Sequence, residues 1–294
     1  MPASLSPALI AAVDDLEVVA RLIVEGMRSG QHRSPFHGFS NEFSQYRAYR
    51  PGDDLKYLDW KMLARSDRLY TRQFRETTNM SAVVCLDSSG SMAYPEGEMS
   101  KFRYASMMAA ALAHLIIMQG DAVGLMTMQG GRLVYVPARG GRAHLRTVLA
   151  QIDRLEPALA WEPKTVVARA ADLLRRRGLV CVISDFYDAP EETRVELRRV
   201  NRRGHDVALL QVVSKQEVEL PFSGDLEFED LETGSHVLLD PRSARSAYRN
   251  AIAAFLEDWR SGATRDGFDY ALMTTDESPS EALRRYLLRR GATR

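Results

Sequence analysis

The chain has 294 residues, of which 45% are hydrophobic, and its 39 basic residues balance 39 acidic ones. This length and apolar content suffice for a full core in one α/β domain, while zero net charge argues against a protein that binds nucleic acid or an anionic membrane over its whole surface. No run approaches the roughly 20 apolar residues of a membrane span, and both cysteines fall in predicted buried strands, so we expect a cytoplasmic protein with reduced thiols.

The first 79 residues predict a helix followed by an extended arm. Apolar residues from Leu9 to Val24 recur at three- and four-residue steps, the spacing of an amphipathic helix, and the acidic residues among them exclude a secretory signal. Residues 29–79 show little periodicity and end in a strand near 69–74. An arm of this length favours a partner-binding role, because long structureless loops are uncommon in compact domains. We therefore divide the chain into 1–79, with the arm packing on the main domain, and 80–294.

Residues 80–294 alternate between strand and helix patterns, which predicts a mainly parallel sheet with helices on both faces. Gly130 and Gly131 make two of the strands a hairpin. A second, acidic hairpin is inserted at about residues 216–240, and we favour a solvated face over a docking surface for a basic partner. The predicted strands span 81–87, 121–127, 132–137, 179–184, 206–213 and 268–273, and the predicted helices span 100–119, 143–154, 164–177, 190–202, 242–261 and 279–290.

The most informative motif follows the first strand of this domain, where residues 87–92 read Asp-Ser-Ser-Gly-Ser-Met. Asp87, Ser89 and Ser91 offer one carboxylate and two hydroxyls at alternate positions of a loop, and Mg²⁺ prefers such an oxygen-only ligand set. Few ligand charges leave the cation able to attract a partner's carboxylate. The alternative is that these residues only cap the helix after Gly90, because Asp and Ser bond free N–H groups at helix N-termini.

Two later segments place further oxygen atoms at the same edge of the sheet. Thr165 lies at the start of a helical pattern, and Asp185 follows the apolar strand 179–184. Two buried strands that each deliver an aspartate at the carboxyl end are typical of ligand sites in open parallel sheets.

Together these residues resemble the metal-ion-dependent adhesion site of the von Willebrand factor A domain. The resemblance implies that Ser89, Ser91 and Thr165 contact Mg²⁺ directly, or Mn²⁺ or Ca²⁺ in its place. It also implies that Asp87 and Asp185 act largely through coordinated waters. The sequence departs from the motif at one point, since Lys164 stands where a glycine normally precedes the threonine.

Further segments resemble the signature of the bacterial family called domain of unknown function 58. One of them reads Arg-Ala-Tyr-Arg-Pro-Gly-Asp-Asp at residues 47–54. This resemblance implies a von Willebrand A-like (Rossmann-like) α/β fold, association with MoxR-type AAA+ ATPases and no established catalytic activity. The matching segments are 29–34, 38–43, 47–54, 58–60 and 64–65 in the arm, and 205–207, 217, 219–221 and 230–234 downstream.

The chain lacks the motifs of enzymes that place an aspartate or a serine in such a loop. A phosphotransferase of the haloacid-dehalogenase type needs a second aspartate where Ser89 stands. A serine hydrolase needs Gly-x-Ser-x-Gly with a paired histidine, and an ATPase needs Gly-x-x-x-x-Gly-Lys-Ser/Thr. The six histidines show no metal-ligand spacing. We therefore expect a non-catalytic interaction module in which a MoxR-type AAA+ ATPase, or a client that it remodels, supplies an acidic ligand to the cation.

Two alternatives remain open. In the first, the metal site is structural or vestigial and partners bind the arm, where Trp60 would be an anchor if exposed, since Trp and Arg dominate interface energetics. In the second, a weaker one, the protein is a metal-dependent hydrolase, although no general base is evident near the motif. The arm residues that carry the first alternative are Tyr49, Arg50, Asp53, Asp54, Asp59 and Trp60.

Overall fold

The computed structural model describes residues 13–28, 40–48, 69–77, 80–95, 99–158, 161–188, 190–224, 226–229, 235–239 and 241–292. The chain divides into two compact units, one of residues 1–36 and 81–294 and the other of residues 37–80. The larger unit contains the α/β domain, and the smaller one contains a two-stranded hairpin.

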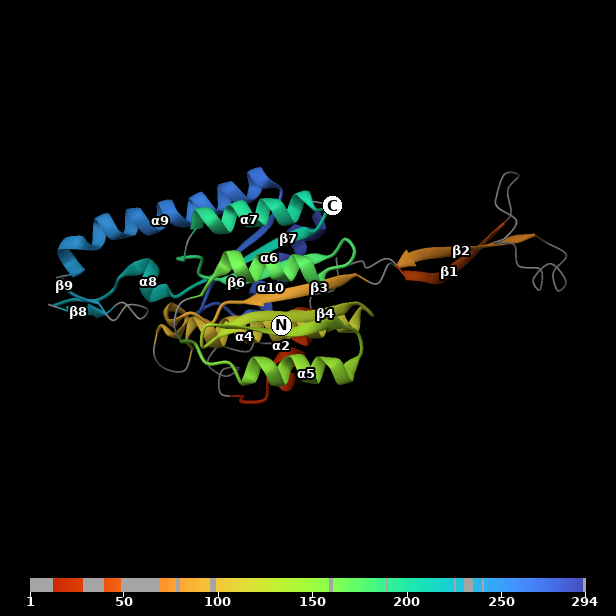
Figure 1. Ribbon diagram of the computed structural model, residues 1–294, viewed down its shortest axis with the longest axis horizontal. Coiled ribbons are helices and arrows are strands. Elements are labelled where there is room, and N and C mark those ends of the chain that lie inside the picture. Colours follow the sequence, from red (N-terminus) through yellow and green to blue (C-terminus); the bar gives the residue numbers. More distant parts are fainter. Residues whose placement is uncertain are drawn as a thin grey trace. The chain divides into compact units, whose positions relative to one another are not determined.

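A six-stranded sheet forms the centre of the larger unit, in the order β10-β7-β6-β3-β4-β5 (Figure 1). All neighbouring strands pair in parallel except β4 and β5, which form the predicted antiparallel hairpin at the edge. The predicted, mainly parallel sheet is therefore confirmed. Its strands are β3 (Ser81–Leu86), β4 (Ala122–Gln129), β5 (Arg132–Arg139), β6 (Leu179–Ser184), β7 (Asp206–Val213) and β10 (Asp269–Thr274).

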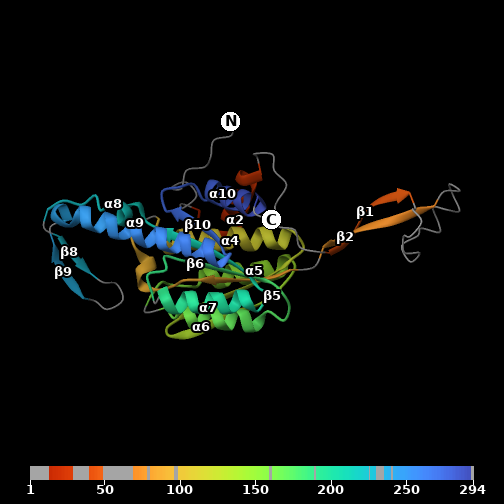
Figure 2. The same cartoon turned by 90° about the horizontal axis from the view of Figure 1, so that it is seen from above.

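Helices cover both faces of this sheet, as predicted (Figure 2). On one face lie α4 (Lys101–Met118) and, around it, α2 (Leu16–Arg28), α5 (Arg142–Asp153) and α10 (Pro279–Ala292). On the other face lie α6 (Pro163–Leu173), α7 (Pro190–Arg202) and part of α9 (Pro241–Asp266). The strands between these layers are apolar on both sides, which is why β3 and β6 read as continuous runs of small and β-branched residues.

Helix α4 is the central helix of the domain. Most of its 18 residues are buried, because α2, α5 and α10 cover the side that faces away from the sheet. The Ser100 hydroxyl caps its N-terminus by accepting a hydrogen bond from the Arg103 N–H at 3.1 Å. This cap sets the position of Lys101, the first residue of the helix, beside the carboxyl ends of the central strands.

The predicted N-terminal helix is present as α2, and it belongs to the larger unit. Its apolar side is buried against α4 and α10 at Leu16, Val19, Ala20, Ile23 and Val24. The amphipathic spacing thus reports packing onto the α/β domain.

The smaller unit contains β1 (Ser40–Ala48) paired antiparallel with β2 (Tyr70–Thr77). The sequence predicted a strand near the second of these and none at the first. Strand β1 has little apolar alternation, so its strand structure depends on pairing with β2 along the register from Ser40 opposite Thr77 to Ala48 opposite Tyr70.

The acidic insertion holds the predicted hairpin, as β8 (Leu226–Glu229) and β9 (His236–Leu239). The insertion predicted at about residues 216–240 begins with a short helix that the sequence did not predict, α8 (Lys215–Glu219). A capping box explains the difference: the Ser214 hydroxyl accepts the Glu217 N–H, while the Glu217 carboxylate accepts the Ser214 N–H. Within the described part of the chain, no helix combines the length and apolar character needed to cross a membrane.

Candidate functional site

The candidate site lies at the carboxyl edge of the sheet, where β3, β6 and β7 end side by side. Asp87 follows β3, Asp185 follows β6 and Ser214 follows β7. A 3-10 turn, η2 (Gly90–Ala93), continues from the loop after β3. Ser89 stands at the N-terminus of η2, but its side chain makes no capping hydrogen bond there, so helix capping does not explain this serine.

Asp87 is the innermost group of the site, with 1% of its surface exposed. Its Oδ1 accepts the Ser89 N–H at 2.8 Å, and its Oδ2 accepts the Ser184 hydroxyl at 2.5 Å. Burial, together with the charge of Asp185, raises the pKa of Asp87 to about 7. The fold therefore holds this carboxylate where its negative charge is incompletely compensated.

Two serine hydroxyls connect the loop after β3 with Asp185. Ser89 Oγ lies 3.0 Å from Ser91 Oγ, and Ser91 Oγ donates to Asp185 Oδ2 at 2.9 Å. Four of the five predicted ligands, Asp87, Ser89, Ser91 and Asp185, are thus brought together from loops that are far apart in the sequence. They meet because parallel strands place their carboxyl ends at one edge of the sheet.

Thr165, the fifth predicted ligand, makes a different contact. It lies in the first turn of α6, where Pro163 begins the helix, and its hydroxyl donates to Glu162 Oε2 at 2.9 Å. Among the described residues, Thr165 shares no hydrogen bond with the other four predicted ligands. The arm residues Tyr49, Arg50, Asp53, Asp54, Asp59 and Trp60 lie outside the described part of the chain.

Lys101 is a functional candidate that the sequence reasoning missed. Its side chain is completely buried, and its Nζ lies 2.7 Å from Asp185 Oδ2 and 2.6 Å from Glu217 Oε1. Burial lowers the pKa of Lys101, but the charges and hydrogen bonds of the two carboxylates outweigh burial and raise it overall. Lysine is almost never fully buried unless paired, so the ammonium is an internal cation of the site.

Glu217 is the second candidate that was missed, and it reaches the site from α8. Its Oε1 accepts from Lys101, while its Oε2 accepts the Ser214 N–H at 2.8 Å. Burial raises the pKa of Glu217, and the Lys101 charge opposes that shift. The Ser-x-x-Glu pattern of a capping box, at Ser214 and Glu217, was the available sequence signal for this helix start.

Aromatic rings and a fixed loop surround the charged groups. The Lys101 ammonium lies 4.8 Å from the ring centroid of Tyr187, whose ring in turn lies 5.3 Å from that of Phe255. Gln211 Nε2 donates to the Asp185 carbonyl at 2.8 Å. Phe186 adopts φ of 61°, an unfavourable value for a bulky residue, and its ring packs on Trp259 at 4.6 Å. These contacts hold Asp185 in one orientation.

The donor set fits a hard divalent cation. Two ligands at adjacent octahedral positions, each about 2.1 Å from Mg²⁺, lie roughly 3.0 Å apart. The 3.0 Å spacing of the serine hydroxyls is compatible with that value, and it is also the length of an ordinary hydrogen bond between them. Within the described residues, no cluster of three or more His, Cys, Asp or Glu side chains could hold a metal, so any ion here would depend on hydroxyls and water.

The net charge of the buried side chains also favours a divalent cation. Asp87, Asp185 and Glu217 carry three negative charges when ionised, and Lys101 carries one positive charge. The buried group as a whole then has a net charge of −2, which is costly in a protein interior. One divalent cation would neutralise it.

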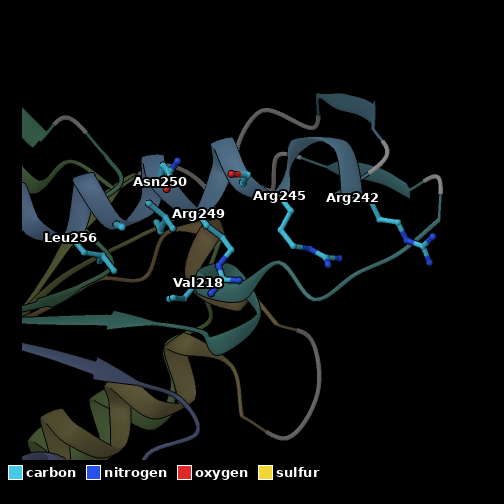
Figure 3. Close-up of a pocket in the computed structure, with 9 residues that line it drawn as sticks. Val218, Arg242, Arg245, Arg249, Asn250 and Leu256 are labelled. Carbon is cyan, nitrogen blue, oxygen red and sulfur yellow. The ribbon is translucent and has the colours of Figure 1, made fainter.

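A groove lies between α8 and α9. It has a volume of about 680 Å³ and is bounded by Val218 of α8 and by one face of α9. Arg242, Arg245 and Arg249 project along this face of α9 (Figure 3). Val218 directly follows Glu217 in α8, so this helix contributes one residue to the Lys101 contact and the next to the groove.

A mainly parallel sheet with one antiparallel edge, helices on both faces and a serine-rich loop after its central strand define a von Willebrand A-like α/β domain. Residues 45–257 match the family described as "Protein of unknown function DUF58", and the chain belongs to that family.

Similar proteins include a relative in sequence and two solved structures. An uncharacterized protein of Mycobacterium tuberculosis is 32% identical over 258 residues, which cover 86% of this chain and 80% of the relative. The crystal structure of an aerotolerance-related membrane protein from Bacteroides fragilis matches 73% of this chain and 100% of its own, with a TM-score of 0.50 and 15% identity, which shows a shared fold. The Rpn10 VWA domain covers 70% of this chain and 94% of its own, with a TM-score of 0.45 and 10% identity.

Proposed function

We propose that the protein is an interaction module that holds a divalent cation at the carboxyl edge of its sheet and binds a protein partner there. Mg²⁺ is the proposed ion, with Mn²⁺ or Ca²⁺ as substitutes. Ser89 and Ser91 would ligate it directly, and Asp87 and Asp185 would act largely through waters. Thr165 would join the ligands only after its hydroxyl leaves Glu162. The observation that carries the proposal is that the side chains of Asp87, Ser89, Ser91 and Asp185 meet at one edge of the sheet, with the two serine hydroxyls 3.0 Å apart.

A binding role fits the site better than catalysis. When bound, the cation supplies positive charge that an acidic side chain of a partner can ligate. A hydrolase would also need a general base within hydrogen-bond reach of an attacking water. The carboxylate oxygens of Asp87 already accept hydrogen bonds from the Ser89 N–H and the Ser184 hydroxyl, and Asp185 accepts hydrogen bonds from Ser91 and Lys101.

The proposed partner is a MoxR-type AAA+ ATPase or a client that it remodels. This part of the proposal comes from the family resemblance, which associates such chains with these ATPases in the assembly or remodelling of complexes. The chain itself has a neutral overall charge, so recognition would depend on the local charges of the edge.

Calorimetric titration with Mg²⁺ and Mn²⁺ tests the metal site. We expect binding in the wild type and its loss in Ser89→Ala. Ser88→Ala is the matched control, because the Ser88 hydroxyl lies by Thr127 and the Met128 carbonyl. Circular dichroism establishes that each variant is folded. Equal cation binding in Ser89→Ala and the wild type would contradict the proposed ligand set.

Chelation separates this function from the alternatives. Partner binding that fails in EDTA and in Ser89→Ala supports a contact bridged by metal. Binding that persists in EDTA and fails when Tyr49 or Trp60 is changed would select the arm as the binding surface. Metal-dependent turnover that is lost in Asp185→Ala would select the hydrolase.

A further inference from the structure

In the ion pair of Lys101 and Glu217, a carboxylate of this chain contacts the buried Lys101 ammonium directly. The Nζ to Oε1 distance is 2.6 Å, which is short for a charge-assisted hydrogen bond. Glu217 is more exposed than the two charged groups it adjoins: 14% of its side chain is accessible, against 0% for Lys101 and 2% for Asp185. Any ligand that approaches Lys101 from this side must therefore replace Glu217.

We propose that Glu217 occupies the carboxylate-binding position of its own site, and that an acidic segment of a partner protein binds by displacing Glu217 from Lys101. Helix α8 is then a latch, closed in the structure and open when the partner is bound. The inference rests on the proposed function only in taking this edge of the sheet as the partner-binding surface.

The attachment of α8 is suited to release. None of its five residues is buried, in contrast to α4. Polar contacts hold it instead: the Lys101 contact, the capping box at Ser214 and a 2.9 Å hydrogen bond from Tyr94 Oη to Gln216 Oε1. Elements with few buried apolar contacts open locally more easily than packed ones, so the contacts that a ligand has to replace at α8 are polar.

The buried ammonium selects the kind of ligand that can replace Glu217. Removing one partner from a buried ion pair leaves an uncompensated charge, which is strongly unfavourable. A carboxylate from another protein restores the same charge-assisted hydrogen bond to Lys101, whereas a neutral side chain does not. Displacement by an acidic side chain is therefore a near-balanced exchange.

The arginine groove extends this preference to a segment with several acidic residues. Arg245 holds the chain after α8 through hydrogen bonds to the carbonyls of Leu220 and Phe222, at 3.0 and 2.5 Å. Arg242 and Arg249 lie on either side of Arg245 along α9, and both are exposed along the same groove (Figure 3). A peptide with one carboxylate on Lys101 could place further carboxylates against these guanidinium groups.

Peptide binding by Glu217→Gln tests the latch. The probe is a fluorescein-labelled decapeptide of alternating glutamate and glycine, titrated by fluorescence anisotropy against the full chain. The amide of the variant competes poorly for Lys101, so we expect at least about tenfold tighter binding than in the wild type. Glu219→Gln is the matched control, because Glu219 is exposed on the same helix, and it should bind the peptide like the wild type.

Two further measurements test the same contact. Lys101→Met in the Glu217→Gln background should abolish the gain in affinity, and hydrogen exchange at the α8 amides should be faster in Glu217→Gln than in Glu219→Gln. Equal peptide affinity in Glu217→Gln and the wild type, with both proteins folded, would overturn the proposal. So would an equal gain for a labelled oligothymidine, which would indicate a general anion site.

The peptide titrations are repeated in Mg²⁺ and in EDTA so that the latch proposal and the metal-site proposal can be refuted independently. A tenfold gain in both buffers supports the latch even if the wild type binds no cation. Cation binding that is lost in Ser89→Ala, combined with no gain in Glu217→Gln, supports the metal site and overturns the latch.

Discussion

Lys101→Met should destabilise the protein far more than the same change at an exposed lysine. Met has a similar length and no charge, so the variant removes the ammonium and leaves Asp185 and Glu217 as neighbouring carboxylates without it. Breaking a buried ion pair by removing one partner costs about 3–5 kcal/mol. Lys215→Met is the control, because Lys215 lies 3.7 Å from Asp276 with both side chains more than half exposed, and such pairs contribute roughly 0–1 kcal/mol.

Urea unfolding followed by circular dichroism measures this difference. The titrations are made in EDTA, so that no divalent cation compensates the two carboxylates, and the slope of the transition is compared between variants to verify that the unfolded states are equivalent. A loss below about 1 kcal/mol in Lys101→Met would refute the argument that Lys101 is the internal counterion.

A double variant separates the charge from the packing. Lys101→Met with Glu217→Gln removes one of the uncompensated carboxylates, so it should be more stable than Lys101→Met alone. The coupling free energy between the two positions should be about 0.5–3 kcal/mol, the range found for residues in direct contact. Additive effects of the two substitutions would mean that the 2.6 Å contact contributes nothing to stability.

Three further predictions concern the cation, the sheet and the pH dependence. Asp87→Ala should lower Mg²⁺ affinity in calorimetry at least tenfold while the protein stays folded, because the proposed site would lose the carboxylate that accepts hydrogen bonds from water on the cation; unchanged affinity would remove Asp87 from the site. Gly124→Ala should destabilise the protein by about 1–3 kcal/mol in urea unfolding, because the added Cβ would lie 2.7 Å from the Val136 carbonyl oxygen. Gly262→Ala should instead stabilise the protein by about 0.5–1 kcal/mol, because Gly262 lies within α9 with open space where the Cβ would be. The reverse order of stabilities would contradict the close pairing of β4 with β5. Burial lowers the pKa of His114 and of His205, so the unfolded chain binds more protons and these residues reduce stability as the pH falls below about 6.5. Between pH 7.5 and 5.5 the wild type should therefore lose more stability than His114→Gln/His205→Gln, and equal losses would show that neither histidine matters.

Secondary structure was predictable where local pattern and burial agree. The runs 81–87 and 179–184 are apolar and β-branched because both faces of β3 and β6 are covered, and their observed bounds differ from the predicted ones by at most a residue. Strand β1 was missed because its structure depends on pairing with β2. Helix α8 was missed because a five-residue helix with no buried residue has no apolar stripe.

The sequence by itself determined the fold class and the loop of oxygen atoms after β3. Asp87, Ser89 and Ser91 are close in the chain, and a buried strand followed by a polar loop carries them to the carboxyl edge whatever the rest of the chain does. Asp185 could be added because a second strand of the same kind ends there, and parallel strands end together.

Only the tertiary structure decided the partners of these atoms. Lys101 is 84 residues from Asp185 and 116 from Glu217, and its place follows from the packing of α4 under three other helices. The Thr165 hydroxyl donates to Glu162, three residues earlier in the chain, a contact that depends on how the start of α6 is built. Local patterns set backbone conformation and the edge to which a loop belongs. Contacts between side chains depend on how distant elements pack, and buried charged side chains have to pair with one another.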